Sequence, residues 1–187
     1  MQPNRKKRVA LDVDGTLADV MPMWVKVYNE EYNKNLDYQN ISQWAFWISL
    51  GITTREFFRI FSKAWSRWEE IQPTETNITQ TIKTLNRLCV VDIVTGRTKD
   101  TLKFVKNWLR KHQIQYQNFI AVSSWQHKIY LPYDLYIDDS PDLAQLAAHK
   151  QKMFLLYNRP WNTMVMEGPW IKRINNLKEA IKTIVCD

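Results

Sequence analysis

Residues 9–17 read Val-Ala-Leu-Asp-Val-Asp-Gly-Thr-Leu, and the expected architecture follows from this segment. The apolar run predicts a buried strand that delivers Asp12 and Asp14 at its carboxyl end, before Gly15 and Thr16 turn the chain. Strand residues two apart point to the same face, so we expect the two carboxylates to lie together. One carboxylate can attack an electrophile while the other handles a proton. Paired acids after a strand also cap turns, so other segments must decide between these two interpretations.

Further strands are predicted to end in polar residues, as the first one does. The predicted strand that begins at Cys89 ends at Thr95-Gly96-Arg97, and a short strand at 119–123 precedes a loop that contains Lys128. The predicted strand at 133–137 ends at Asp138-Asp139, and a fifth follows at 153–157. Strands alternating with helices predict a Rossmann-like α/β fold, a parallel sheet with helices on both faces. In such sheets the carboxyl ends of the strands carry the functional residues.

The segment between the first strand and residue 72 has a different composition. Half of the 24 aromatic residues fall within residues 21–70. Trp24, Tyr28 and Tyr32 recur at helical spacing, and Thr53 with Glu56 forms a capping-box pattern that opens a second helix. We therefore expect a small helical cap at residues 19–71, inserted into a core domain made of residues 1–18 and 72–187. Aromatic stripes of this kind are more often core than ligand platform.

Composition limits the function classes. A chain of 187 residues that is 45% hydrophobic can bury one core, or a core and a small lid. No apolar run approaches the roughly 20 residues that a membrane span needs, so no membrane partner is expected. The two cysteines show neither metal-site spacing nor a disulfide framework, which predicts a reducing, cytoplasmic location. The formal net charge of +7 favours anionic partners, with phosphate esters and nucleic acid as the alternatives.

The full set of motifs resembles the haloacid dehalogenase (HAD) superfamily of aspartate-nucleophile phosphohydrolases. The set is Asp-Val-Asp-Gly-Thr-Leu at 12–17, Thr95 with Gly96, Lys128, and Asp138-Asp139, in that order. The resemblance implies that Asp12 is the nucleophile that forms an aspartyl-phosphate and that Asp14 is the general acid/base. Dehalogenases of the superfamily lack the second aspartate, because a halide leaves without a proton.

The same resemblance implies the remaining roles. Mg²⁺ would be held by the Asp12 side chain, the Asp14 carbonyl and Asp138, with Asp139 supporting that ligand, although Asp139 stays the alternative direct ligand. Thr95, Gly96 and Lys128 would bind the substrate phosphate. His127 and Lys152 are the alternatives to Lys128, which the pattern places less securely. Arg97 would bind substrate or pair with a surface carboxylate.

A closer but less specific resemblance links the chain to the 5'(3')-deoxyribonucleotidases and their microbial relatives. It rests on Val-Thr-Gly-Arg at 94–97, Ile-Asp-Asp-Ser-Pro at 137–141 and Arg-Pro-Trp-Asn at 159–162. It implies a Mg²⁺-dependent phosphomonoesterase acting on nucleoside monophosphates, with Trp24, Phe46 and Trp47 as candidates for stacking on the base. A phosphatase for sugar phosphates or nucleic-acid 3'-phosphate ends is the alternative, followed by a non-catalytic nucleotide-binding module. A homodimer through the aromatic segment is a further hypothesis.

Overall fold

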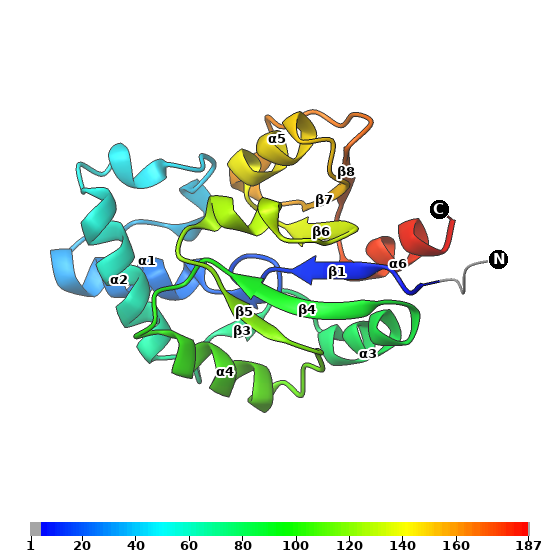
Figure 1. Ribbon diagram of the computed structural model, residues 1–187. Coiled ribbons are helices and arrows are strands. Elements are labelled where there is room, and N and C mark those ends of the chain that lie inside the picture. The colour runs from blue at the N-terminus through cyan, green and yellow to red at the C-terminus, as the bar shows by residue number, and fades with distance from the viewer. Residues whose placement is uncertain (1–4, 187) are drawn as a thin grey trace.

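A parallel β-sheet forms the centre of the structure, a computed structural model that describes residues 5–186 (Figure 1). Residues 1–4, which belong to the predicted core segment 1–18, and Asp187 lie outside the described residues. The six strands, in the spatial order β5-β4-β1-β6-β7-β8, all run in the same direction. Their bounds are Arg8–Leu11 (β1), Val90–Thr95 (β4), Phe119–Ala121 (β5), Leu135–Asp138 (β6), Phe154–Tyr157 (β7) and Ile171–Ile174 (β8). The prediction of a Rossmann-like α/β fold is confirmed.

Helices cover both faces of this sheet. Buried residues of α3, α4 and α6 form one apolar core with Val9 and Leu11, whereas buried residues of α5 form a second core with Ala10. The alternation of β1 side chains between the two cores is the period-two geometry of a strand. The helices are α3 (Ile78–Leu88), α4 (Leu102–Lys111), α5 (Pro141–His149) and α6 (Leu177–Cys186). Among the described residues, none of the helices is long and apolar enough to cross a membrane.

A helical segment follows β1 and returns to the sheet through a short antiparallel pair. Strand β2 (Ala18–Asp19) pairs with β3 (Gln72–Pro73), so the chain leaves and re-enters at adjacent points. Between them lie α1 (Met21–Tyr32), α2 (Thr54–Ser66) and two short 3₁₀ helices, η1 (Tyr38–Asn40) and η2 (Phe46–Ile48). Figure 1 shows α1 and α2 beyond one end of the sheet, on the opposite side from α6.

The predicted helix starts agree with the structure. Thr53 caps α2 by accepting a hydrogen bond from the Glu56 N–H, and Glu56 completes the capping box. Ser140 caps α5 in the same way, with Pro141 in its first turn. Strand β8 at the sheet edge is not among the strands predicted from the sequence. Its two central residues, Lys172 and Arg173, are charged and only half-buried, so the segment lacks the apolar run that revealed the other strands.

A buried carboxylate ties together the amino-terminal part of the sheet. Asp92 on β4 has no exposed surface, and Arg8 and Tyr133 donate to its Oδ2 at 2.8 and 2.7 Å. Asn118 donates to its Oδ1 through both the backbone N–H and the side chain. Burial alone would raise the pKa of Asp92, but these hydrogen bonds outweigh it and lower the pKa.

Asp92→Asn is expected to lower the free energy of unfolding by about 2 kcal/mol at neutral pH, because Asn has the same shape but loses the charge-assisted bonds. A depressed folded-state pKa contributes stability above the unfolded value of about 3.9, and this contribution is lost as the pH falls through the folded value. Urea unfolding of both proteins between about pH 7 and about pH 3 should show a difference that shrinks in acid. A difference that stays constant over this range would contradict the assignment.

Candidate active site

The carboxyl end of β1 presents two aspartates in a tight turn. The Asp12 N–H donates to the Ile137 carbonyl at 3.0 Å, which extends the pairing with β6 and fixes the start of the turn. Gly15 follows with φ at +76°, a conformation that residues with a side chain adopt rarely. Asp12 is 5% exposed, whereas the side chain of Asp14 is 21% exposed and faces the cavity described below.

Lys128 lies between two of the carboxylates. Its Nζ donates to Asp12 Oδ1 at 2.5 Å and to Asp138 Oδ2 at 2.7 Å, and the lysine is 6% exposed. The lysine comes from η3 (Trp125–Tyr130), between β5 and β6. Among the alternatives, His127 is instead paired with Ser123 through Nδ1 at 2.9 Å, and Lys152 does not line the cavity.

The second acid of the pair at 138–139 is held by the segment that follows β7. Trp161 donates from Nε1 to Asp139 Oδ2 at 2.9 Å, and the Asn162 side chain donates to the Asp139 carbonyl at 2.9 Å. Arg159 from the same segment donates from Nε to the Gly15 carbonyl at 2.6 Å. This segment, residues 159–162, therefore fixes both the β1 turn and the acidic pair.

Burial and mutual repulsion dominate the electrostatics of the acidic cluster formed by Asp12, Asp138 and Asp139. Burial raises the pKa of Asp12 well above its usual range, and the neighbouring Asp138 adds to the effect. The same two causes raise the pKa of Asp139 to about 8. Burial opposes the charge of Lys128, but the adjacent Asp12 and Asp138 outweigh it and raise its pKa.

This acidic cluster has the composition of a divalent-metal site. Asp12, Asp138 and Asp139 each offer a carboxylate oxygen, and these atoms lie within 4.8 Å of one another. Carboxylates are the ligands that Mg²⁺ prefers, and three of them lie here with one lysine between Asp12 and Asp138. The residues present therefore fit a divalent cation.

The end of β4 supplies a third group of polar atoms. Thr95 is fully buried, and its hydroxyl has no hydrogen-bond partner among the described residues. Gly96 and Arg97 line the cavity, while Thr95 lies directly before them. The Arg97 guanidinium stacks on the Phe61 ring at 4.2 Å, and its Nε lies 3.7 Å from Asp14 Oδ2. Burial lowers the pKa of Arg97 from its usual value.

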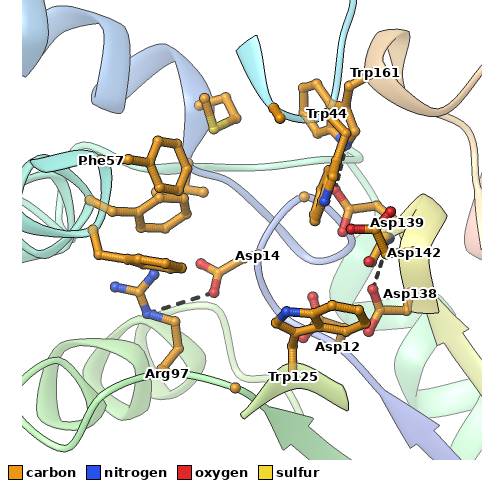
Figure 2. Close-up of a pocket in the computed structure, with 18 of the residues that line it drawn as sticks. Asp12, Asp14, Trp44, Phe57, Arg97, Trp125, Asp138, Asp139, Asp142 and Trp161 are labelled. Carbon is orange, nitrogen blue, oxygen red and sulfur yellow. Dashed lines mark hydrogen bonds and ion pairs between the residues drawn. The ribbon is translucent and has the colours of Figure 1, made fainter. Parts of the chain in front are cut away.

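A cavity of about 320 Å³ opens directly above these groups. In Figure 2, Asp14 lies between Arg97 on one side and Asp12 and Asp138 on the other. The helical segment supplies an aromatic wall of the cavity, and Phe57 lies across the cavity from Asp138 and Asp139 (Figure 2). The aromatic lining residues from this segment are Trp44, Phe46, Trp47, Phe57, Phe58 and Phe61. The volume lies at the small end of the range for ligand pockets, which are usually apolar with a few convergent polar groups.

The aromatic candidates from the sequence divide into two groups. Phe46 and Trp47 line the cavity, and the Trp47 ring lies 4.2 Å from the Phe57 ring. Trp24 does not line it, which corrects the expectation that this residue contacts a substrate. It is fully buried inside the helical segment, where its Nε1 donates to the Phe57 carbonyl at 3.1 Å.

Several residues that contact the site have no predicted role there. Trp65 donates from Nε1 to Asp14 Oδ1 at 2.7 Å, Arg159 holds the Gly15 carbonyl, and Trp161 holds Asp139. Trp65 carried only the signal of an aromatic helical stripe. Trp161 belongs to a distinctive Arg-Pro-Trp-Asn run, which could have signalled a role at the site.

Gly15→Ala is expected to lower the free energy of unfolding much more than Gly51→Ala. Both glycines have a positive φ, so an alanine is strained at either position by about 1 kcal/mol or more. A Cβ at Gly15 would lie 2.1 Å from Asp139 Oδ2, whereas a Cβ at Gly51 would meet nothing within 4 Å. Thermal unfolding of both variants measures the difference. Adding Asp139→Ala should recover part of the loss at Gly15 only, and equal effects of the two glycine substitutions would refute the predicted clash.

Comparison with known proteins agrees with the geometry of the site. Residues 6–186 match the family model described as "5' nucleotidase, deoxy (Pyrimidine), cytosolic type C protein". The protein named "Putative nucleotidase BH1399" of Halalkalibacterium halodurans is 23% identical over 188 residues, which cover 96% of this chain and 93% of that protein.

Solved structures of HAD proteins share the fold. A haloacid dehalogenase-like hydrolase from Streptococcus pneumoniae aligns with a TM-score of 0.67 at 14% identity, covering 95% of this chain and 98% of that one. The "putative HAD-hydrolase YfnB" of Bacillus subtilis, bound to magnesium, aligns with a TM-score of 0.61 at 15% identity, covering 97% and 100%. At these identities the likeness establishes the HAD fold.

Proposed function

Because the chain belongs to the family of 5' nucleotidase, deoxy (pyrimidine), cytosolic type C proteins and is a phosphomonoesterase hydrolase of HAD fold, we propose that it hydrolyses nucleoside monophosphates with Mg²⁺. Membership of the family implies a small phosphorylated substrate, and we propose that this substrate is a nucleotide. The observation that supports a nucleotide is the cavity, which combines an aromatic wall with an acidic cluster. A nucleobase is an aromatic plane that stacks well on such a wall, while its phosphate needs the polar floor.

Asp12 is the nucleophile in the proposed reaction. One of its carboxylate oxygens attacks phosphorus, the bond from phosphorus to the ester oxygen breaks, and an aspartyl-phosphate forms. Lys128 supports this role, because its Nζ lies 2.5 Å from Asp12 Oδ1 and holds the carboxylate in position. A water molecule then attacks phosphorus, which releases inorganic phosphate and restores the carboxylate.

Asp14 is the proposed general acid/base. It gives a proton to the leaving ester oxygen in the first step and takes one from the attacking water in the second. Its side chain lines the cavity and is less buried than Asp12, so it can reach a leaving group. The aspartate pair therefore divides nucleophilic and proton-transfer work between two adjacent residues.

The proposed Mg²⁺ ligands are the Asp12 side chain, the Asp14 carbonyl and Asp138, with Asp139 supporting. Mg²⁺ bound there would neutralise charge on the phosphate oxygens and so would lower their repulsion of the Asp12 carboxylate. The three clustered carboxylates support the assignment. Asp138 accepts hydrogen bonds from Lys128 and from the Ser140 N–H, whereas Asp139 accepts one from Trp161. The Mg²⁺ affinities of Asp138→Asn and Asp139→Asn would show which of the two acids is the direct ligand.

Thr95, Gly96 and Lys128 are the proposed phosphate-binding residues. A buried hydroxyl without a partner is costly unless a ligand satisfies it, and the Thr95 hydroxyl is such a group, directly before Gly96, which lines the cavity. Arg97, Phe46 and Trp47 are the further substrate-binding candidates, because all three line the cavity. Trp24 is no longer among them.

We also propose that residues 19–71 form a cap on a core domain made of residues 1–18 and 72–187. The β2–β3 pair at 18–19 and 72–73 supports this division, because it brings the two connections side by side. The cap supplies the aromatic wall and the core supplies the acidic cluster, so the substrate would be enclosed between them.

The experiment is a phosphate-release panel with Mg²⁺ or with a chelator. The substrates are ribo- and deoxyribonucleoside 5'- and 3'-monophosphates, sugar phosphates and a 3'-phosphorylated oligonucleotide. The proposal predicts metal-dependent turnover that is fastest for one group of nucleoside monophosphates. Faster turnover of sugar phosphates, or of the oligonucleotide with steep salt dependence, would replace the nucleotide assignment.

A further inference from the structure

Two groups approach the Asp14 carboxylate from outside its own turn. Trp65, which is 51 residues away in α2, donates from Nε1 to Oδ1 at 2.7 Å. Arg97 lies on the other side, with its Nε at 3.7 Å from Oδ2. The distance to Trp65 is that of a short charge-assisted hydrogen bond, whereas the contact with Arg97 is a longer ion pair.

The indole of Trp65 is itself firmly held. It has no exposed surface and packs edge-to-face on Trp108, with ring centroids 6.5 Å apart and an interplanar angle of 84°. Trp108 is anchored in turn by its Nε1, which donates to the Ile71 carbonyl at 2.9 Å. The Trp65 N–H therefore points at Asp14 from a rigid support, which is the condition for holding a side chain in one orientation.

Resting on the nucleotidase mechanism proposed above, we propose that Trp65 is a positioning residue for the general acid/base. An indole N–H is a donor only, so Trp65 can neither accept nor relay the transferred proton and must act through Asp14. By holding Oδ1, it fixes the rotation of the carboxylate and leaves Oδ2 to exchange the proton with the leaving oxygen and the water. Helix α2 also carries Phe61, whose ring contacts the Arg97 guanidinium. Residues of α2 therefore hold both side chains that approach the Asp14 carboxylate, Trp65 directly and Arg97 through Phe61.

The role predicts a dependence on the leaving group. A nucleoside leaves as a strongly basic alkoxide and needs the proton from Asp14, whereas p-nitrophenolate is weakly basic and leaves without one. Loss of the Trp65 N–H should therefore slow nucleotide hydrolysis and spare the first step with p-nitrophenyl phosphate. A general distortion of the cavity would slow both.

The experiment compares Trp65→Phe with Tyr133→Phe in the full chain with Mg²⁺. Each substitution removes a buried donor to an aspartate, but Trp65 donates to Asp14 and Tyr133 donates to Asp92, which lies outside the cavity. For the best nucleoside monophosphate, Trp65→Phe should lower kcat about 10- to 100-fold with KM within about twofold, as expected for loss of a charge-assisted bond. The rapid burst of p-nitrophenol should stay within about twofold of wild type, and Tyr133→Phe should leave kcat unchanged.

Three results would overturn the role: an unchanged kcat in Trp65→Phe, an equal slowing of the p-nitrophenol burst, or an equal loss of kcat in Tyr133→Phe. If Trp65→Phe does not fold, benzothienylalanine at position 65 keeps the indole shape and lacks the N–H, and the same outcomes apply. A wild-type protein that turns over neither substrate would instead overturn the proposed function. Turnover by wild type with no effect at Trp65 would overturn only the positioning role.

Discussion

Asp12→Asn is expected to lower kcat for phosphate release at least about a thousandfold, the scale of loss when a covalent nucleophile is removed. An amide is a poor nucleophile and cannot form the aspartyl-phosphate. The fold should survive, because Asn has the same shape and removes a charge whose burial and repulsion by Asp138 raise the pKa of Asp12. The free energy of unfolding is therefore expected to be equal to or above that of wild type.

Steady-state kinetics and urea unfolding on the same preparation measure both effects. Asp92→Asn is the control, since it is buried and acidic but lies outside the cavity, and it should lose stability while keeping kcat. Asp12→Asn with more than about a tenth of wild-type kcat would contradict the nucleophile assignment, because no mechanism through Asp12 allows it.

Lys128→Met is expected to lower both stability and activity. The lysine is the cation that touches Asp12 and Asp138, and removal of one partner from a buried ionic cluster costs about 3 kcal/mol or more. The phosphate would also lose a positive charge at the reacting centre, so kcat should fall about a hundredfold or more. Added Mg²⁺ should raise the Tm of Lys128→Met more than that of wild type, because the unbalanced carboxylates gain a counter-charge.

Calorimetry with and without Mg²⁺, together with phosphate release, tests this result. Lys83→Met is the control, because Lys83 is an exposed residue of α3 far along the chain from the cluster. A Tm for Lys128→Met that equals wild type in the absence of metal would show that the lysine does not balance the cluster. An equal rise in Tm on adding Mg²⁺ to wild type and to Lys128→Met would show that the metal does not bind at Asp12 and Asp138.

The sequence predicted what depends on local pattern. Asp12 and Asp138 were predicted at one sheet edge because apolar strands and their polar ends are visible in the chain, and the Thr53 cap of α2 follows from four residues. Strand β8 was missed because its centre is charged, and its place is set by pairing with β7. A local pattern therefore reveals elements that are apolar along their own length.

The roles of individual aromatic residues depend on tertiary packing. Trp24 and Trp65 both belong to helical stripes, yet Trp24 donates to the Phe57 carbonyl inside the helical segment and Trp65 donates to Asp14. Which indole N–H reaches Asp14 depends on where the tertiary fold places α2 relative to the turn after β1, across 51 residues of chain. Spacing alone could not distinguish the two.

The most direct measurement of the mechanism is mass spectrometry of the protein after a rapid acid quench during turnover of p-nitrophenyl phosphate. Asp14→Asn is the variant to use, because p-nitrophenolate leaves without a proton from Asp14, whereas slower hydrolysis of the intermediate should let it accumulate. The expected result is one added phosphoryl group, located on the peptide that contains Asp12 and absent from the Asp12→Asn protein. Metal-dependent turnover with no phosphorylated Asp12 at any quench time would contradict a covalent mechanism through this residue.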